Sequence, residues 1–346
     1  MNRTTLSILA ATTLVASFLS LGASDAVQAT EPCQLLATTA KTSPIDVAAT
    51  SLDTLARCGS LTGRTLDYAG QKITVPAPGT GWTYSAVRVP GDTGPTEVSV
   101  NYYADNTIGV QIVGAGKRSL LGSTSRVAAF RTMNAEAAFP APETLAAAAV
   151  STKCASTKYS KKTAFMINEY KFYINTGGSY PTGAGSRIKD GAATIIGITN
   201  QCGVTADTGI DYNYAGTTTR TAQVPADDGA NCSSNDGYSV HSWGALDSPV
   251  AATCTFTSGA WVTSADTKYN SAFTWWTDSA TTGCSGKYDV QGIATHEIGH
   301  AFGLKDLTGT TAASTSQVMY ESSGTCRYAN RYLGGGDILG LKDIYN

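Results

Sequence analysis

A short run of residues, His296-Glu297-Ile298-Gly299-His300, has the residue types and the spacing of a zinc site with an adjacent base. Residues four apart lie on the same face of a helix, so both imidazoles could reach one metal ion. Glu297 follows the first histidine and could accept a proton from water at that metal. The chain has only three histidines, and two of them fall at this spacing, so chance is a poor explanation.

A third ligand is expected after His300, because a catalytic zinc ion takes three protein ligands and keeps one position open. Gly303 can adopt the left-handed conformation that ends a helix and turns the chain back beneath the metal. Asp306 follows this turn and is the ligand that the spacing favours. His241 and Glu321 are the rival ligands, and His241 lies far away on a predicted strand.

The elements that must position these residues predict an α+β domain over residues 154–346. A helix is expected from Asp289, a good N-cap residue, to Gly303, a good C-cap residue. A last helix is expected from Asp337 to Tyr345. The remaining patterns predict a helix over 187–198 and strands over 171–175, 238–243 and 261–269.

The N-terminal part differs in composition. Residues 1–29 have the charged start, the apolar stretch and the small residues before Ala29 that are typical of a cleaved secretory signal. Residues 30–133 form a predicted N-terminal module, with a helix over 30–59 and then short strands in an antiparallel β arrangement. Residues 134–153 are rich in alanine, contain two prolines and indicate a linker before the domain at 154–346.

Composition narrows the function. With Lys+Arg 24 against Asp+Glu 26, the net charge is −2, which offers no basic surface for nucleic acid or for a membrane. Eight cysteines without a C-x-x-C pair favour disulfides in an exported, extracellular protein, expected to be monomeric. Spacing does not fix the pairing. One scheme is Cys33–Cys58, Cys202–Cys232, Cys254–Cys284 and Cys154–Cys326.

The extended motif from His296 to Asp306 resembles the signature of the metzincin zinc metalloproteases, and the matrixin branch in particular. Val318-Met319-Tyr320 resembles the Met-turn, with Met319 as the apolar floor beneath the metal. Further similar segments are Asn200–Gly203, Ala265–Thr267, Tyr288–Val290 and Asp337–Leu341. Matrixins have histidine as the third ligand, whereas Asp306 is the snapalysin-type variant. Glu321 lacks the sequence context of the glutamate ligand in gluzincins.

The resemblance covers residues 154–346 and implies a twisted mixed sheet, an active-site helix, a Met-turn and a C-terminal helix. It implies a secreted zinc endopeptidase that acts on proteins or peptides, with the substrate extended along an edge strand. Residues 261–269 are the candidate for that strand, and Tyr320 could line a substrate pocket or simply pack. The alternatives are a non-catalytic extracellular binding protein on the same scaffold and a zinc hydrolase of small, non-peptide substrates.

Secreted metzincins are often zymogens, so the N-terminal module could be a propeptide cut off between about residues 134 and 165, or a retained accessory domain. Arg57-Cys58-Gly59 resembles the cysteine switch of matrixins, although a disulfide of Cys58 is favoured over that role. Asp227-Asp228-Gly229 and Asn235-Asp236-Gly237 could bind Ca²⁺, but such sequences are more typical of ordinary turns.

Overall fold

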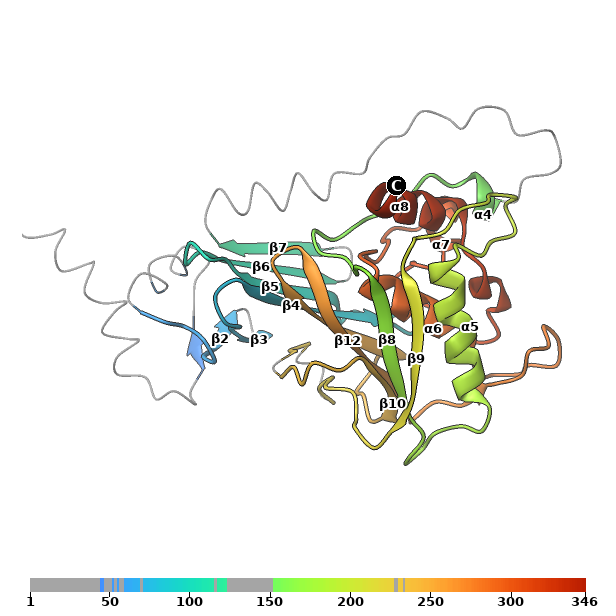
Figure 1. Ribbon diagram of the computed structural model, residues 1–346, viewed down its shortest axis with the longest axis horizontal. Coiled ribbons are helices and arrows are strands. Elements are labelled where there is room, and N and C mark those ends of the chain that lie inside the picture. Colours follow the sequence, from blue (N-terminus) through green and yellow to red (C-terminus); the bar gives the residue numbers. More distant parts are fainter. Residues whose placement is uncertain are drawn as a thin grey trace, which may run out of the picture.

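A nine-stranded mixed sheet dominates the structure, a computed structural model (Figure 1). Its strand order is β7-β6-β5-β4-β11-β12-β10-β8-β9. A smaller sheet of three strands, β1-β2-β3, lies at the N-terminal end. The structure describes residues 44–46, 52, 55, 59–68, 71–114, 117–122, 152–226, 230–232 and 234–346.

The C-terminal half of the large sheet carries the parallel strands. β8 (Glu169–Asn175), β9 (Asp211–Thr218), β10 (Val240–Gly244) and β12 (Trp261–Asn270) pair in parallel, whereas β11 (Ala251–Ser258) is antiparallel to β12. Two helices, α5 (Ala184–Ile196) and α6 (Val290–Ala301), pack against each other beside these strands (Figure 1). The shorter elements are α4 (Thr152–Ala155), β13 (Trp275–Trp276), β14 (Tyr288–Asp289), α7 (Ala312–Thr315), a 3₁₀ turn (Tyr328–Arg331) and α8 (Gly335–Tyr345).

The N-terminal strands continue the same sheet. β4 (Thr80–Val87) pairs antiparallel with β11 along its whole length, from Val87 opposite Ala251 to Thr80 opposite Ser258. An antiparallel meander follows through β5 (Pro95–Tyr102), β6 (Ile108–Gly114) and β7 (Lys117–Gly122). The small sheet consists of β1 (Ile45–Asp46), β2 (Thr65–Tyr68) and β3 (Gln71–Thr74). The strands β4–β7, called here the β4–β7 unit, therefore share one hydrogen-bonded sheet with the strands beside α6.

Two apolar cores lie on opposite sides of this sheet. One joins strands β8 and β12 to the inward faces of α5, α6 and α8, through residues such as Phe172, Ile195 and Ile298. The other joins the small sheet to alternate residues of β4, β5, β6 and β11, such as Tyr84, Val98 and Cys254. Successive strand residues point to opposite faces, so the intervening residues of β4 and β11 face the helix side.

Three expectations about the fold are wrong. The segment over 261–269 is a strand, but β12 lies inside the sheet between β11 and β10 and has no free edge. In the helix expected over 30–59, residues 45–46 instead form a strand, whereas Leu52 and Leu55 are helical and most of the other residues lie outside the described part. The last helix begins at Gly335, before Asp337, because Gly334 rather than Asp337 takes the N-cap position.

The disulfides also differ from the expected scheme. The described bonds are Cys154–Cys202, Cys232–Cys254 and Cys284–Cys326. Each bond joins two cysteines that are consecutive in the sequence, whereas the expected scheme was offset by one cysteine and paired Cys202 with Cys232 and Cys254 with Cys284. Cys33 and Cys58 lie outside the described residues. Three disulfides are typical of an oxidising compartment.

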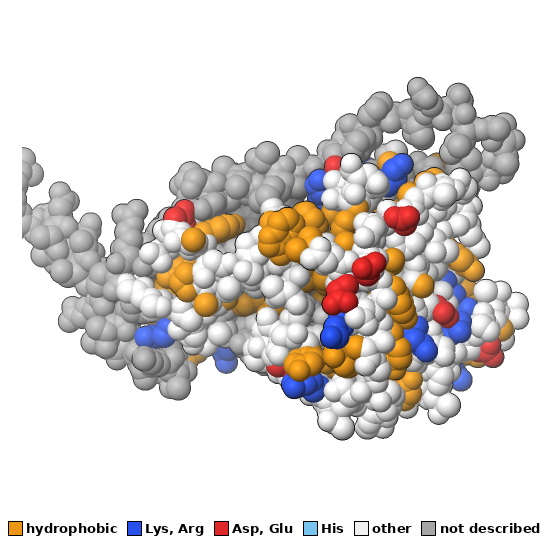
Figure 2. All heavy atoms as spheres, viewed as in Figure 1, with side chains coloured by type: hydrophobic (Ala, Val, Ile, Leu, Met, Phe, Trp, Pro, Cys, Tyr) orange, Lys and Arg blue, Asp and Glu red, His pale blue; other side chains and the backbone are white. Residues whose placement is uncertain are grey.

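The surface agrees with the charge balance. On the face drawn in Figure 2, positive and negative side chains form small, separate groups among uncharged ones. No histidine is visible among the described residues on this face, because all three histidines are at most 1% exposed. None of the helices in the described part of the chain is both long enough and apolar enough for a bilayer span.

Candidate metal centre

Helix α6 carries the two candidate histidine ligands, and both of its ends are fixed. At the start, the Asp289 carboxylate caps the helix by accepting a hydrogen bond from the Gly292 N–H at 2.7 Å. The same carboxylate accepts from Arg331 in a buried ion pair: Nε–H is shared between its two oxygens, at 3.0 and 3.1 Å, and Nη2 donates to Oδ2 at 2.5 Å. The prediction that Asp289 caps this helix is therefore confirmed.

At the other end, the chain turns sharply to bring Asp306 back over the helix. Gly303 has φ +95°, a conformation that disfavours any side chain, and a Cβ there would lie 3.0 Å from that of Phe165. The Leu304 N–H then bonds to the Gly299 carbonyl at 2.9 Å and closes the turn. This local geometry explains why a residue three positions after the glycine reaches the helix face that bears His296 and His300.

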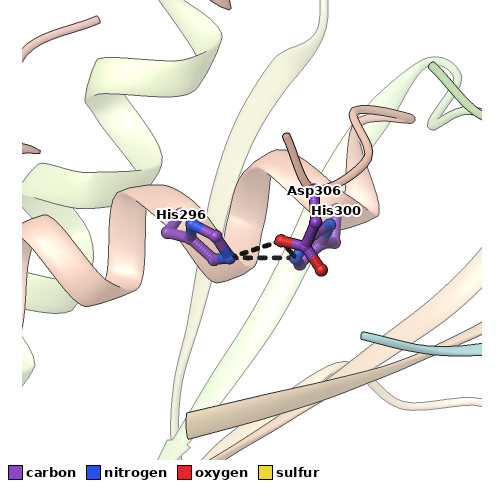
Figure 3. A group of neighbouring side chains, drawn as sticks. All are labelled: His296, His300 and Asp306. Atoms are coloured by element: carbon purple, nitrogen blue, oxygen red, sulfur yellow. Dashed lines mark hydrogen bonds and ion pairs between the residues drawn. The ribbon is translucent and has the colours of Figure 1, made fainter. Parts of the chain in front are cut away.

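The three predicted ligands meet at one point (Figure 3). The two Nε2 atoms lie 3.1 Å apart. Asp306 Oδ1 lies 3.1 Å from His296 Nε2 and 3.4 Å from His300 Nε2. All three side chains are at most 3% exposed, and neither oxygen of Asp306 has a hydrogen bond of good geometry. This is a buried group of three potential metal ligands.

These separations fit a tetrahedral metal ion. Zinc bonds of about 2.0–2.1 Å at tetrahedral angles place neighbouring ligand atoms about 3.3 Å apart. The Nδ1 atom of His296 lies 2.8 Å from the Val318 carbonyl oxygen, and that of His300 lies 3.1 Å from the Leu304 carbonyl oxygen. A carbonyl can only accept, so both Nδ1 atoms carry the proton and both Nε2 lone pairs are available to a metal.

The electrostatics of the group also call for a cation. Burial alone would lower the pKa of His296, but the adjacent Asp306 carboxylate outweighs it and raises that pKa to about 9. Burial likewise opposes ionisation of Asp306, yet the two histidines hold its pKa well below the usual range. A positive charge, as a proton or as a metal ion, is therefore stabilised between these three side chains.

Glu297 is completely buried beside the triad and is held from two strands. Its Oε2 accepts a hydrogen bond from the Thr253 hydroxyl on β11 at 2.7 Å. Its Oε1 accepts one from the backbone N–H of Val87 on β4 at 3.3 Å. Burial raises the pKa of Glu297 above its ordinary value, against the opposing effect of the nearby histidines. A carboxylate with a raised pKa suits proton transfer near neutral pH.

Met319 and Asp337 support the triad from below. The Met319 sulfur packs so closely on α6 that a Cβ at Gly299 would lie 2.5 Å from it. The Asp337 carboxylate accepts hydrogen bonds from the N–H groups of Val318 at 2.8 Å, Gly334 at 2.9 Å and Met319 at 3.2 Å. Asp337 thus fixes the residue whose carbonyl orients His296.

Three polar side chains of the β4–β7 unit contact lysines beside the candidate site. The Lys305 ammonium lies 2.6 Å from Glu97 Oε1 on β5 and 2.7 Å from the Gln111 side-chain oxygen on β6. Lys162 donates to the His300 carbonyl at 3.1 Å and to the Ser85 hydroxyl on β4 at 3.3 Å. The N-terminal strands therefore contact both sides of the candidate site.

The rival ligands lie outside the triad. His241, on β10, has its ring nitrogens 2.9 Å from the Tyr170 hydroxyl and 3.1 Å from the Tyr269 hydroxyl, and burial lowers its pKa to about 3. Glu321 does not belong to the metal-binding group, although burial and the charge of Asp306 raise its pKa to about 6. Tyr320 is half-buried and pairs with Leu307, and its role in a substrate pocket stays a prediction.

The turns considered for calcium give no cluster among the described residues. The side chains of Asn235 and Asp236 accept hydrogen bonds from nearby backbone N–H groups, as in ordinary Asx turns, and Asp236 also pairs with Arg220. Among the residues that the structure describes, one group of side chains is suited to hold a metal ion, and it is the triad of His296, His300 and Asp306. Asp227-Asp228-Gly229 lies outside the described residues.

Sequence reasoning missed Thr253, Val87 and Asp337. Thr253 and Val87 reach Glu297 only because β4, β11 and α6 meet, across sequence separations of 44 and 210 residues. No local pattern marks either residue. Asp337 did carry a signal, since an acidic residue at the start of a helix can bond backbone N–H groups.

The chain matches no protein-family model, and a search of the curated proteins finds no match either.

Proposed function

We propose that this protein is a secreted zinc endopeptidase, in which His296, His300 and Asp306 hold the metal and Glu297 serves as the general base. The observation that carries the proposal is the buried triad itself, with two Nε2 atoms and a carboxylate oxygen 3.1–3.4 Å apart and no hydrogen bond to the carboxylate. Such groups stay buried together at lower cost when a cation joins them.

Zinc, when bound, supplies a Lewis acid that polarises a carbonyl group and makes water more acidic. Glu297 lies beside that position, and its raised pKa lets it take a proton from water and later give it to the leaving amine. Thr253 holds Oε2 of Glu297, so the exchange falls to Oε1, which accepts a hydrogen bond from the Val87 N–H in this structure. The resemblance to metzincins and the three disulfides support a protein or peptide substrate outside the cell.

Casein zymography with and without o-phenanthroline tests the activity, and zinc content measured on the same samples tests the site. Glu297→Ala should abolish cleavage and leave zinc bound, because Glu297 is not one of the three ligands. A matched variant, Glu169→Gln, replaces an exposed carboxylate on β8 and should change neither property. Equal cleavage by Glu297→Ala and the unchanged chain would refute the proposed mechanism.

A further inference from the structure

The end of β4 runs through a backbone channel beside Glu297. On one side, β4 pairs antiparallel with β11, with Ser85 opposite Thr253 and Val87 opposite Ala251. On the other side, the Arg88 N–H donates to the Glu321 carbonyl at 3.0 Å, and the Arg88 carbonyl accepts from the Ser323 N–H at 2.9 Å. At its end the segment is thus bound through its main chain on both edges, by β11 at Val87 and by Glu321 and Ser323 at Arg88, whereas residues 80–85 pair with β5 on the edge away from β11.

This is how proteins bind peptides by strand addition, in which main-chain hydrogen bonds to a sheet edge provide affinity for an extended ligand. The strand order makes β4 the only cover of this edge of β11 within the described sheet. The segment from Glu321 to Ser323 directly follows Met319 and Tyr320, so both walls of the channel belong to the candidate site.

The contact with Glu297 fits the same interpretation. The Val87 N–H, 3.3 Å from Glu297 Oε1, is a peptide N–H held against the group proposed to protonate a leaving amine. The cavity that borders Asp306 has a volume of ≈ 70 Å³ and is lined by Glu97 of β5, Val113 of β6 and the segments around Tyr159 and Lys305. That is room for about five water molecules.

We propose that β4 is a built-in pseudosubstrate, whose residues 80–88 occupy the channel of an extended peptide substrate and keep Glu297 closed to other peptides until the strand is displaced. The proposal rests on the peptidase function proposed above. The ligand proposed for the channel is the main chain of an extended peptide. In this structure the channel is occupied by a segment of the same chain, residues 80–88.

The two faces of the β4–β7 unit show where displacement can begin. The face away from the metal belongs to an apolar core with the small sheet. The face towards the Asp306 loop is polar, with Ser85, Glu97 and Gln111 buried there, and Thr255 of the neighbouring strand β11 is also buried. Glu97 Oε2, Gln111 Nε2 and Thr255 Oγ1 lack hydrogen-bond partners in the described structure. Incompletely paired polar groups make an interface weaker than an apolar core of equal size.

Arg88 anchors the segment in the channel. Its guanidinium is buried and pairs with Asp92 at 2.7 Å, with the Ser248 hydroxyl at 2.7 Å and with the Pro95 carbonyl at 2.6–2.9 Å. Arg88→Ala removes these contacts without touching the triad or Glu297. Arg187→Ala is the matched control, because Arg187 forms a partly exposed ion pair with Asp190 on α5.

The test uses the zinc-loaded full chain and two readouts. Anisotropy measures binding of a labelled peptide with the sequence of residues 80–89, and a quenched fluorescent casein measures hydrolysis. Arg88→Ala should bind the peptide about tenfold more tightly than the unchanged chain, as expected when about 1.4 kcal/mol of competing strand docking is lost. Hydrolysis should rise by a similar factor, and Arg187→Ala should change neither readout.

If Arg88→Ala fails to retain zinc, the test is made instead with a chain that can be cut by a site-specific protease. A recognition sequence for a site-specific protease, inserted between residues 140 and 145, lets the covalent link between β7 and α4 be cut in the folded chain. The cut chain should then bind the labelled peptide more tightly than the uncut chain. Glu97→Gln, which removes the ion pair with Lys305, should increase that difference.

The outcomes separate the two proposals. Tighter peptide binding without hydrolysis by any form would support the pseudosubstrate and refute the peptidase. The unchanged chain could instead bind the peptide and hydrolyse casein as well as Arg88→Ala or the cut chain does. That result would overturn the pseudosubstrate proposal and leave the peptidase proposal standing.

Discussion

Asp337→Asn perturbs the candidate metal site from a residue outside the ligand triad. The carboxylate accepts two backbone N–H groups at Oδ2 and one at Oδ1. The asparagine NH₂ group cannot accept a hydrogen bond. Where it replaces Oδ2, the hydrogen bonds from Val318 and Gly334 are lost; where it replaces Oδ1, the one from Met319 is lost. Turning towards Met319 costs less and leaves one buried N–H unpaired.

The magnitude follows from this choice. One unpaired buried N–H costs about 1–3 kcal/mol, and the two remaining hydrogen bonds lose the strength of a charged acceptor. Burial raises the pKa of Asp337, which shows that desolvation of the charge offsets part of that loss. We expect Asp337→Asn to lower the free energy of unfolding of the metal-free protein by about 2–4 kcal/mol.

The same change should weaken zinc binding. Val318 donates its N–H to Asp337 and offers its carbonyl to His296 Nδ1, so a shift of this residue releases the imidazole. Loss of such outer hydrogen bonds typically lowers metal affinity about 10–100-fold. Urea unfolding with intact disulfides measures the first effect, and competition with a chromophoric chelator measures the second.

Asp343→Asn is the control, because Asp343 lies on the same helix but forms a partly exposed ion pair with Lys161 at 2.6 Å. Exposed pairs contribute at most about 1 kcal/mol, and Asp343 makes no hydrogen bond to the Met319 turn. If Asp337→Asn behaved like Asp343→Asn in both assays, the supporting role derived for Asp337 would be wrong.

Three further predictions concern charge and metal. Asp306→Asn should lower zinc affinity by more than about 100-fold, measured by chelator competition, because it removes a ligand charge; an unchanged affinity would make Glu321 the ligand to test. Chelating the metal should lower the free energy of unfolding by about 4 kcal/mol relative to protein at free zinc about 1,000 times its dissociation constant, and Asp306→Asn should lose most of this response. Burial lowers the pKa of His241 from 6.5 to about 3, so below pH 6.5 the unfolded chain binds a proton that the folded chain does not. The contribution of the buried neutral ring to folding stability is therefore complete above pH 6.5 and is lost as the pH falls towards 3. The unchanged protein should therefore lose about 2 kcal/mol more than His241→Gln between pH 8 and pH 5 in urea unfolding; a difference between the two proteins that does not vary with pH would contradict this.

The candidate ligands could be predicted because their geometry is local. The spacing of His296 and His300 on one helix and the glycine turn before Asp306 depend on residues within ten positions of one another. The cap at Asp289 is equally local. Each of these features follows from helix geometry, which a sequence states directly.

The surroundings of the site could not be predicted because they depend on strand order. Residues 261–269 were correctly expected to form a strand, but their place inside the sheet is set by which strands pair with them. The pairing of β4 with β11 joins segments that lie far apart in sequence, whereas the three described disulfides join consecutive cysteines. Alternation of polar and apolar residues gives the faces of a strand and not its neighbours.

The disulfide Cys284–Cys326 closes a covalent ring that contains every residue of the candidate site on α6, the Asp306 loop and the Met319 turn. Closing a loop of this length restricts the unfolded chain by about 4 kcal/mol in the loop-entropy description. The ring also changes what a single backbone nick can do. A cut in the exposed stretch around Thr308–Thr311 would leave both fragments joined through sulfur, with the three ligands still on one covalent framework.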